Sequence, residues 1–484
     1  MTEAAPAILA VDLGTTDVKA GLVAADGSLV GRARAGVAVD IDGATGAAEQ
    51  DPERWWAALR EVVRALGVPA SGSGPAAVCV VGQGPTMVPV DRRGIATHPA
   101  VTWLDARPVG EAAALEAATG LTGWGLGILP AARWLERTDP AAADRTAWYL
   151  NAWEWAALRI GGTAATTRSL GQVLPDPGGA AEAGLAVERL PQVVPSGSVV
   201  GAVTAAAARD LGIPAGIPVV AGMVDSYASF HGAGLVDAGD AVDTGGTSGG
   251  LALYRDSAVD VPGTWVAAAP LPDRWLVGGA MTATGRSLDW LAEDALGGVA
   301  VTDLIEEAAG VRPGADGLLF LPYLAGERSP IWDPLARGAF VGLTLGHGRA
   351  HLARAVLEAA AFALRHVAEP IQEAGLPIDH LVVTGGTARS DTWNAIKADV
   401  LGVQVVVPAE LETALVGAAI LAATALGWHA DASSAIRAMV RYDHRLEPDP
   451  AASAAYDEAF AAYKALWPAL APVIHRVHKA PTDT

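Results

Sequence analysis

The run Ile8-Leu9-Ala10-Val11-Asp12-Leu13-Gly14-Thr15-Thr16 is the most informative stretch of the chain, because it leads an apolar strand into an aspartate and then into a Gly-Thr turn. The same form returns at Ala241-Val242-Asp243-Thr244-Gly245-Gly246-Thr247-Ser248. Glycine lets a ligand approach the backbone closely and hydroxyl groups add donors, so each turn can direct N–H groups at a phosphate. One such turn alone is more often an ordinary hairpin turn. Two turns at corresponding places in two halves favour a nucleotide held between two domains.

Outward from these two runs, the chain is long enough for two domains, because 484 residues exceed what one hydrophobic core usually serves. The segment Gly232–Asp240 is the expected connection between them. The predicted domains are residues 1–236 and residues 237–484, and the second ends in a C-terminal helix. The first half is the longer between corresponding landmarks, so substrate-recognising elements are expected there.

Local signals place further elements. A hairpin with a type I′ turn is predicted at Asp26-Gly27, and a helix is predicted to begin at Asp51-Pro52 by the capping and first-turn preferences of these residues. In the second half, the strand His380–Thr384 leads to a glycine pair and then to the predicted helix Asp391–Leu401.

Two aspartates end apolar strands and are candidates for chemistry. Asp12 could hold Mg²⁺ beside the first turn and so offset charge on a transferring phosphoryl group. Asp225 follows the run Pro218–Val224 and could accept a proton from an alcohol in a desolvated position. The alternatives are that Asp12 caps its turn and that Asp225 is a helix N-cap.

Trp103 and Asp105 pair an apolar face with a hydroxyl acceptor, which is typical of sugar recognition, although each alone is more often structural.

Two familiar phosphate-binding motifs are missing from the sequence. It contains no Gly-Lys dipeptide, which excludes a P-loop, and no G-x-G-x-x-G follows the first strand.

The composition excludes several kinds of partner. A formal net charge of −20 without any cluster of Lys and Arg argues against nucleic acid and anionic membranes. Cys79 is the only cysteine, so no internal disulfide can form. The N-terminus lacks the features of a signal peptide, and the longest apolar run, 414–428, is shorter than the roughly 20 residues of a membrane span. A cytoplasmic protein is expected.

Seven motifs in order resemble the FGGY family of carbohydrate kinases. They are Asp12-Leu13-Gly14-Thr15-Thr16, Glu49-Gln50-Asp51-Pro52 with Trp55-Trp56, Trp103-Leu104-Asp105-Ala106-Arg107, Gly222-Met223-Val224-Asp225, Gly246-Thr247-Ser248-Gly249, Tyr323-Leu324-Ala325-Gly326-Glu327-Arg328-Ser329-Pro330 and Gly385-Gly386-Thr387-Ala388-Arg389-Ser390. The Glu327-Arg328 block looks most like the xylulokinase branch.

The resemblance implies an α/β fold of two ribonuclease-H-like domains, as in actin, hexokinase and the Hsp70 ATPase, with a cleft for ATP, Mg²⁺ and a sugar or polyol. It gives Asp225 the role of catalytic base and Asp12 that of metal-associated aspartate. The residues it places at the nucleotide are Thr15, Thr16, Gly246, Thr247, Ser248, Gly285, Asp289, Gly385, Gly386 and Ser390. Those it places on the substrate side are Gln83, Gly84, Trp103, Asp105 and Ser226.

The implied activity is ATP-dependent phosphorylation of a primary hydroxyl, xylulokinase-like, but three departures bear on the substrate. Xylulokinases usually place Met-His directly after the glutamine, whereas Gly84-Pro85 leaves space beside Gln83 and Trp103. The family commonly has an acidic residue near Thr167, and Ser226 replaces the amide that follows the base in many members. D-Xylulose is therefore expected to be a poor substrate, and gluconate, ribulose, fuculose, glycerol or another polyol are alternatives.

Two rival interpretations stay open. One is a non-catalytic member of the same ATPase superfamily, such as an actin-like or sensor protein, and Asp225 with the pair Trp103 and Asp105 argues against it. The other is a paralogue that binds sugar and ATP without turnover. A homodimer also stays open.

Overall fold

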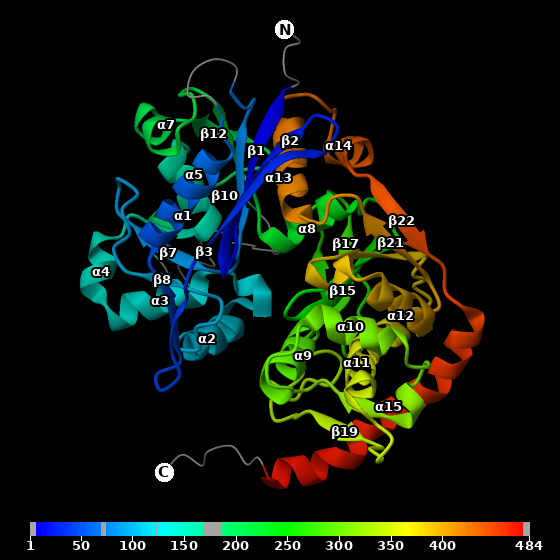
Figure 1. Cartoon of the computed structure of the whole chain (residues 1–484). Coiled ribbons are helices and arrows are strands. Elements are labelled where there is room, and N and C mark those ends of the chain that lie inside the picture. The colour runs from blue at the N-terminus through cyan, green and yellow to red at the C-terminus, as the bar shows by residue number, and fades with distance from the viewer. Residues whose placement is uncertain (1–5, 69–73, 122, 168–185, 478–484) are drawn as a thin grey trace. The chain divides into compact units, whose positions relative to one another are not determined.

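The structure is a computed structural model that describes residues 6–68, 74–121, 123–167 and 186–477 (Figure 1). It is a mixture of helices and strands, as the α/β prediction requires. No helix within these ranges is both long enough and apolar enough to cross a membrane.

The chain divides into two compact units. Unit 1 comprises residues 1–234 and 412–440, and unit 2 comprises residues 235–411 and 441–484. The first change of unit therefore falls two residues before the division expected at residue 236, while the segment 412–440 joins unit 1 from the second half. The division at 236 took no account of that returning segment.

The main sheet of unit 1 has the strand order β12-β13-β6-β1-β2-β3. Its strands are β1 (Ala7–Leu13), β2 (Asp17–Ala24), β3 (Leu29–Gly36), β6 (Val78–Gly82), β12 (Val199–Ala202) and β13 (Pro218–Val220). β1 pairs antiparallel with β2 and parallel with β6, which in turn pairs parallel with β13. Because parallel strands buried on both faces read as apolar runs, β1 and β6 are almost wholly hydrophobic. Their carboxyl ends meet at one edge, near Asp12.

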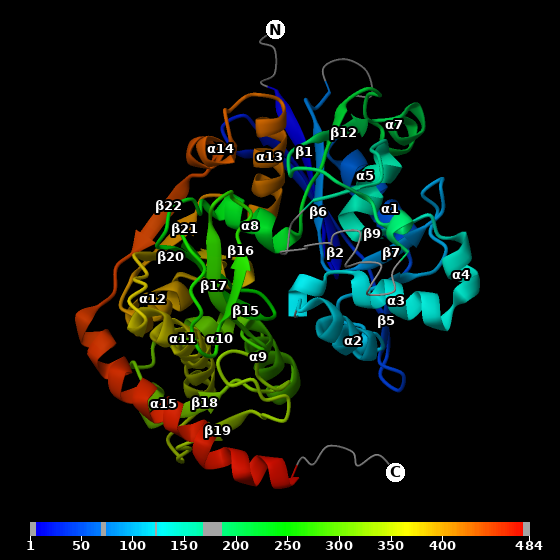
Figure 2. The same ribbon diagram turned by 180° about the vertical axis from the view of Figure 1, so that it is seen from behind.

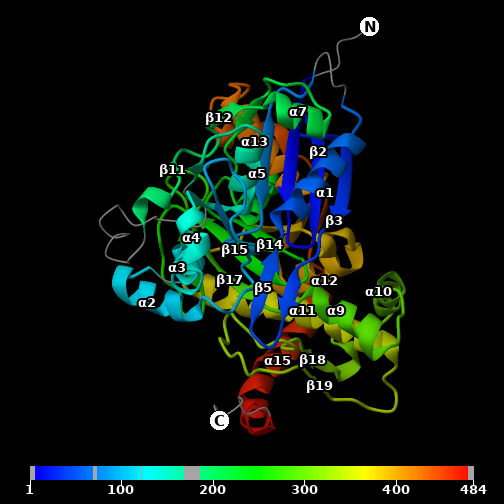
Figure 3. The same ribbon diagram turned by 90° about the vertical axis from the view of Figure 1, so that its left-hand side faces the viewer.

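Helices cover this sheet on both faces. They are α1 (Pro52–Ala65), α5 (Ala152–Ile160), α7 (Ala205–Leu211), α8 (Asp225–Ala233), α13 (Thr413–Ala425) and α14 (Ala432–Met439). Figure 3 shows α1 beside β2 and β3, and Figure 1 shows α13, in orange, beside the blue strand β1. α13 comes from far along the chain, yet it is buried along almost its whole length.

Two glycines let α8 and α13 cross at close range (Figure 2). A Cβ atom on Gly417 would lie 1.9 Å from the carbonyl oxygen of Ala228, and one on Gly232 would lie 1.9 Å from that of Thr413. Any side chain at either position would push the helices apart. This crossing fastens the returning segment 412–440 to unit 1.

A second, five-stranded sheet of unit 1 has the order β4-β5-β8-β7-β9. Its strands are β4 (Asp40–Asp42), β5 (Ala47–Gln50), β7 (Met87–Val90), β8 (Ala100–Val101) and β9 (Trp148–Asn151). The helices α2 (Val109–Thr119), α3 (Leu129–Thr138) and α4 (Pro140–Arg145) and the short pair β10 (Ala165–Thr166) and β11 (Gln192–Val193) complete this region, with single turns at Gly123–Leu126 and Val187–Arg189. It belongs to the longer first half, where substrate-recognising elements were expected.

The main sheet of unit 2 has the order β16-β17-β15-β14-β20-β21-β22. Its strands are β14 (Asp240–Thr244), β15 (Gly249–Arg255), β16 (Trp265–Ala268), β17 (Trp275–Met281), β20 (His380–Thr384), β21 (Gln404–Pro408) and β22 (Tyr442–Leu446). β14 pairs antiparallel with β15 and parallel with β20, and β20 pairs parallel with β21. The inner five strands thus repeat the order and directions of β3-β2-β1-β6-β13. This repeated topology is the ribonuclease-H-like fold.

The helices of unit 2 pack around α11, the long central helix of its larger core. They are α9 (Gly285–Trp290), a π-turn at Leu291–Ala295, α10 (Val301–Ala309), α11 (Arg349–Glu373), α12 (Asp391–Leu401) and α15 (Pro450–Val477), with the hairpin β18 (Leu319–Leu321) and β19 (Ala339–Val341) and single turns at Ala315–Gly317 and Gly386–Arg389. α15 is the C-terminal helix that the sequence predicted, and it packs against α11, α12 and β18.

Of two local predictions in unit 1, the helix cap at Asp51 is confirmed and the turn type at Asp26-Gly27 is wrong. Asp51 caps α1 by accepting a hydrogen bond from the N–H of Glu53, as its sequence signature predicted. The turn at Asp26-Gly27 is not type I′, because only Gly27 has a positive φ, of 86°. A four-residue connection joins β2 to β3 there, and such loops are usually built on a type I turn that needs one left-handed residue.

Candidate active site

Asp12 is the penultimate residue of β1, opposite Lys19 of β2 and Val81 of β6. Its side chain is buried, and its Oδ1 has no hydrogen-bond partner within the described part of the chain. Lys19 Nζ lies 3.8 Å from Asp12 Oδ2, beyond hydrogen-bond distance. Burial, followed by repulsion from Asp225, raises the pKa of Asp12 to about 7, against the opposing attraction of Lys19. The charge of this carboxylate is therefore poorly compensated by the protein.

Asp225 is the first residue of α8, and Val224 before it forms an isolated parallel bridge with Gly82 at the end of β6. The N-cap of α8 is Val224, so Asp225 is not the N-cap that the sequence offered as an alternative. Asp225 Oδ1 accepts a hydrogen bond of 2.6 Å from the N–H of Ser226. Burial raises the pKa of Asp225, while that hydrogen bond and Lys19 oppose the shift. Asp12 and Asp225 are thus two interacting carboxylates at one edge of the sheet.

This pair fits a divalent cation that takes few protein ligands. Mg²⁺ commonly binds one or two carboxylates, completes its octahedron with waters and phosphate oxygens, and dispenses with a closed protein cage. Among the residues that the structure describes, no group of three or more His, Cys, Asp or Glu side chains could hold a metal. The unpartnered Oδ1 of Asp12 is the oxygen free to coordinate such an ion.

The turn Gly14–Thr16, expected to bind phosphate, connects β1 to β2. Three side chains from other elements contact it. The side-chain amide of Gln83 donates to the Gly14 carbonyl at 3.3 Å, and that of Gln50 donates to the Thr15 carbonyl at 2.9 Å. The indole N–H of Trp103 donates to the Thr15 hydroxyl at 3.0 Å. Gln83 and Trp103, predicted to lie on the sugar side, therefore contact the turn Gly14–Thr16.

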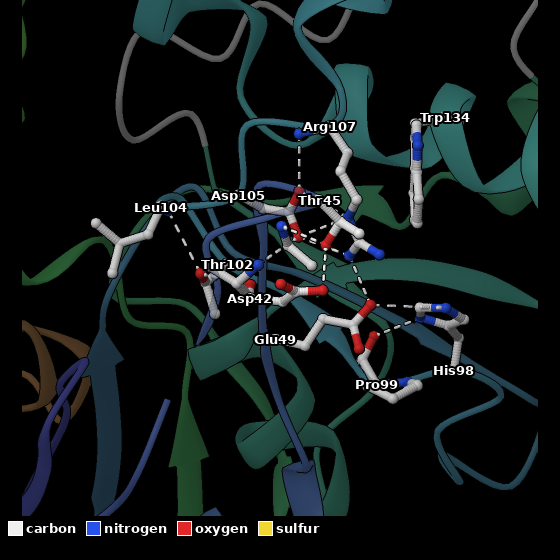
Figure 4. Close-up of polar contacts among 12 residues, drawn as sticks. Asp42, Thr45, Glu49, His98, Pro99, Thr102, Leu104, Asp105, Arg107 and Trp134 are labelled. Carbon is white, nitrogen blue, oxygen red and sulfur yellow. Dashed lines mark hydrogen bonds and ion pairs between the residues drawn. The ribbon is translucent and has the colours of Figure 1, made fainter. Parts of the chain in front are cut away.

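Asp105, the other expected sugar contact, lies in an enclosed network shown in Figure 4. Its side chain has no exposed surface. One oxygen accepts the N–H of Arg107 and the other that of Ala48, both at 2.9 Å, and the guanidinium of Arg107 bonds to both oxygens. The same guanidinium reaches Glu49 at 2.5 Å. In this conformation Asp105 fixes the loop that carries Trp103, a residue that is 40 % exposed.

Gly84 does not leave the open space that its lack of a side chain suggested. A Cβ atom there would lie 2.8 Å from Cζ3 of Trp153 and 3.3 Å from a methyl group of Val224. The indole of Trp153 is buried and occupies the region where a larger residue at position 84 would point. Thr167, where the family commonly has an acid nearby, is also buried and donates to the Gly222 carbonyl at 3.0 Å.

In unit 2, the turn Gly246–Ser248 lies between two glycine-containing segments. The N–H of Gly285, at the start of α9, donates to the Gly246 carbonyl at 3.0 Å, and a Cβ there would come within 2.4 Å of that oxygen. Gly385 has a φ of 73°, and its Cβ would come within 2.4 Å of the Gly245 carbonyl. The structure therefore brings Gly246, Thr247, Gly285 and Gly385 together.

The remaining predicted nucleotide residues lie on helices near these glycines. Ser390 caps α12 by accepting the N–H of Trp393 at 3.2 Å, and Gly386 faces open space where a Cβ would stand. Asp289 is on α9, where partial burial raises its pKa. Ser226, which was predicted on the substrate side and not at the nucleotide, belongs to unit 1, where it follows Asp225 on α8 and is partly exposed.

Beneath the second turn lies an ion pair that the sequence did not reveal. Lys397 Nζ is 2.6 Å from Asp243 Oδ2 and donates to the Thr387 hydroxyl at 3.0 Å. Both Asp243 and Lys397 are 3 % exposed. One signal was present, because the chain has only four lysines, and two of them, Lys19 and Lys397, lie against the aspartates of the two repeated runs.

Two domain matches define the class of this protein. Residues 7–170 match the N-terminal domain of the FGGY family of carbohydrate kinases, and residues 241–426 match its C-terminal domain. The chain therefore belongs to the FGGY family and is a carbohydrate kinase.

Individual relatives carry more than one substrate name. The chain is 31 % identical to the xylulose kinase of Escherichia coli K12 over 82 % of its own length and 85 % of that protein. It is 28 % identical to a gluconokinase of Bacillus licheniformis over 91 % of each. The crystal structure of xylulose kinase from Rhodospirillum rubrum matches with a TM-score of 0.83 and 32 % identity, covering 97 % of this chain and all of that one. The resemblance drawn from the motifs is confirmed.

Proposed function

We propose that this kinase transfers the γ-phosphoryl group of Mg²⁺·ATP to a primary hydroxyl of a ketopentose, a related sugar or a polyol. The observation that carries this proposal is the pair Asp12 and Asp225, one buried and one half-buried carboxylate, of which Asp12 has an oxygen without any partner in the described structure. Perturbed carboxylates at the carboxyl edge of a sheet are typical of functional sites. The location proposed is cytoplasmic, where ATP is available, and a homodimer stays a prediction.

Asp225 is the proposed general base. As the acceptor oxygen attacks the γ-phosphorus, its proton passes to the carboxylate of Asp225, the bond from phosphorus to the bridging oxygen breaks, and ADP leaves. The Ser226 N–H bond holds one oxygen of Asp225, which leaves the other to face the acceptor. A raised pKa makes Asp225 a better proton acceptor than an ordinary aspartate at the same pH.

Asp12 is the proposed metal ligand. When bound, Mg²⁺ supplies positive charge that offsets the negative charge of the phosphates and of the departing ADP. Lys19 is shared among Asp12, Asp17 and Glu412 at 3.8, 3.9 and 3.1 Å, so it compensates Asp12 only in part. Asp12 therefore keeps the affinity for a cation that a tight ion pair would remove.

The nucleotide is proposed to contact the turns Gly14–Thr16 and Gly246–Ser248, together with Gly285, Gly385 and Gly386. Support comes from the glycines whose missing side chains bring backbone atoms close together and from Gly386, which faces open space. On the acceptor side, Trp103 is the residue best placed to contact a sugar, because it is partly exposed. Asp105 is enclosed and supports the loop that carries Trp103.

A coupled assay of ADP release over ketoses, polyols and aldonates tests the proposal, with gluconate and D-xylulose as two required members of the panel. We expect Mg²⁺-dependent turnover with at least one acceptor and its loss in Asp225→Asn. Absence of turnover with every acceptor, from a folded protein that binds Mg²⁺·ADP, would support the non-catalytic rival instead.

A further inference from the structure

The four carbonyl groups that lead through the first turn all accept hydrogen bonds from within unit 1. The donors are the Gln83 N–H to Leu13 at 2.9 Å, the Gln83 side chain to Gly14 at 3.3 Å, the Gln50 side chain to Thr15 at 2.9 Å, and the Val37 N–H to Thr16 at 2.8 Å. Carbonyl oxygens repel a phosphate, so their engagement on the inner side removes the groups that would oppose an anion.

The side-chain amides of both glutamines are engaged within unit 1, and the Gln50 amide also donates to the Ala38 carbonyl at 3.2 Å. Each glutamine is 1 % exposed, and the Gln83 amide also donates to the Gln50 carbonyl oxygen at 2.8 Å. The Thr86 hydroxyl donates to the remaining oxygen of Gln83 at 3.3 Å. Because each amide nitrogen donates to acceptors on known sides, the network fixes the orientation of both side chains. Each polar atom of the two side-chain amides therefore has a partner within unit 1.

Trp103 completes the set through the Thr15 hydroxyl. An indole N–H is a donor and never an acceptor, so the Thr15 oxygen must accept this bond. The hydroxyl hydrogen of Thr15 is thereby directed to some other acceptor. Within the described ranges, no hydrogen-bond acceptor is found for the backbone N–H groups of Thr15 and Thr16. The turn therefore presents donors outward and keeps its acceptors engaged inward.

We propose that Gln50, Gln83 and Trp103 are positioning residues that act on the nucleotide phosphates through the turn Gly14–Thr16. This inference rests on the proposed function, because it takes the bound anion to be the phosphate chain of ATP. It also changes the role expected for Gln83 from a sugar contact to a support of the turn. Trp103 then serves both ligands, the sugar by its exposed face and the nucleotide by its N–H.

The first test is a double-mutant cycle with Trp103→Phe and Thr15→Val, read out as the dissociation constant of Mg²⁺·ADP by calorimetry without sugar. Phenylalanine keeps an aromatic face and removes the N–H. We expect each single change to weaken Mg²⁺·ADP binding about 3- to 10-fold, as loss of one hydrogen bond implies, and the double change to be no worse than Thr15→Val alone. A Trp103→Phe variant that raises only the KM for sugar would overturn the role assigned to its N–H.

The second test is Gln83→Glu, which keeps the volume but replaces the donating amide by a carboxylate. We expect the KM for ATP to rise about 10-fold or more, with the KM for sugar within about twofold of the parent. Glu154→Gln is the matched control, because Glu154 is also buried and is hydrogen-bonded to Asn151 and Thr166, but no hydrogen bond joins it to the turn. It should lower the melting temperature without changing the KM for ATP. An unchanged KM for ATP in Gln83→Glu would refute the proposal.

Gln50→Glu covers the case in which Gln83→Glu does not fold, since it removes the donor to the Thr15 carbonyl. The nucleotide-binding readout also separates the two proposals. If the parent phosphorylates a sugar while these variants bind Mg²⁺·ADP normally, the proposed function stands and the support role fails. If no acceptor is phosphorylated but the variants weaken Mg²⁺·ADP binding, the support role stands alone.

Discussion

Asp12 in unit 1 and Asp243 in unit 2 occupy corresponding positions, each near the carboxyl end of the first strand of the same five-strand pattern. Each has a lysine nearby, but the distances differ. Lys397 lies 2.6 Å from Asp243 and is itself buried, whereas Lys19 stands 3.8 Å from Asp12 and lies closer to Glu412, at 3.1 Å. One aspartate is neutralised at contact, and the other is not.

This difference teaches that repeating a strand and turn does not repeat the chemistry. In unit 2, Asp243 and Lys397 form a buried ion pair at contact distance, and Lys397 also donates to the Thr387 hydroxyl beside the second turn. This pair therefore serves the packing of unit 2. A buried carboxylate with one unpartnered oxygen costs folding free energy, and such a cost is typical of sites kept for a ligand. The position of one ammonium group decides between the two outcomes.

The largest expected effects concern the unit 1 pair. Asp225→Asn keeps the volume and removes the proton acceptor, so kcat should fall roughly 10²- to 10⁴-fold while sugar binding is retained. Asp12→Asn should lower kcat roughly 10²-fold or more, because it weakens the hold on a metal whose charge stabilisation is worth several kcal/mol. Steady-state kinetics and calorimetry with sugar provide the measurements. Near-normal turnover in Asp225→Asn would remove Asp225 from the chemistry.

Substitutions in the unit 2 pair, Asp243 and Lys397, should change the stability of the protein and hardly affect the chemical step. Lys397→Met leaves Asp243 buried and without its cation, so the free energy of unfolding should fall by about 3–5 kcal/mol. The double variant Asp243→Asn with Lys397→Met should recover much of that loss, because no buried charge remains. Denaturant titration measures both. If Lys397→Met proves as stable as the parent, the contrast between the two aspartates is not electrostatic.

The next largest expected effect is the contribution of Asp12 to the pH dependence of stability. Its pKa is raised in the folded protein, so the folded state binds its proton more tightly than the unfolded chain does. Its contribution to stability is therefore fully present below pH 4 and is lost as the pH rises towards 7. We expect the protein without ligand to lose about 1–4 kcal/mol between pH 4.5 and 7.5 from this group.

Melting temperatures over that pH range, compared for the parent and Asp12→Asn, measure this contribution, and the variant should show a flatter profile. Mg²⁺ should have the opposite dependence, since it binds the deprotonated carboxylate and so stabilises the protein more at pH 7.5 than at pH 5. Parallel profiles for parent and variant would show that Asp12 titrates as an ordinary exposed carboxylate.

The smallest expected effects compare one residue of unit 1, proposed to affect the choice of sugar, with one residue of unit 2, proposed to affect the nucleotide. Trp153→Phe should change the ratio of kcat/KM among sugars by about 3- to 10-fold, because the indole fills the region beside Gly84 and Val224. Gly386→Ala, at a position with open space for a Cβ, is the matched change in unit 2 and should raise the KM for ATP a few-fold. Equal effects of both variants on both KM values would erase this difference.

The same comparison shows how far the sequence could lead. Strand β20 and helix α12 were predicted to the residue, because an apolar run and the glycine pair that follows it mark them locally. The paired runs at Asp12 and Asp243 led to the repeated fold. Their different charge environments were not predicted, since the nearest cation to Asp243 lies at Lys397, far along the chain.

The roles of Gln83 and Gly84 were beyond the sequence for a similar reason. Whether a glutamine faces a ligand or a backbone carbonyl depends on where Gln50 and the first turn come to lie. The empty space beside Gly84 was predicted from the missing side chain at that one position. In the structure, the side chain of Trp153, from another element, fills this space. The assigned roles at the site stay predictions until the variants above are measured.

The glycine crossing of α8 and α13 sets the order in which this protein can be completed during synthesis. The first 234 residues leave the ribosome long before residues 412–440, so the apolar surfaces of β1, β6 and α8 that α13 covers stay uncovered meanwhile. All of residues 235–411 must be made first, and partly finished domains with exposed apolar surface are prone to aggregate. A fragment ending at residue 234 is therefore an unfinished domain, and gene truncation or limited proteolysis at that point should yield insoluble protein.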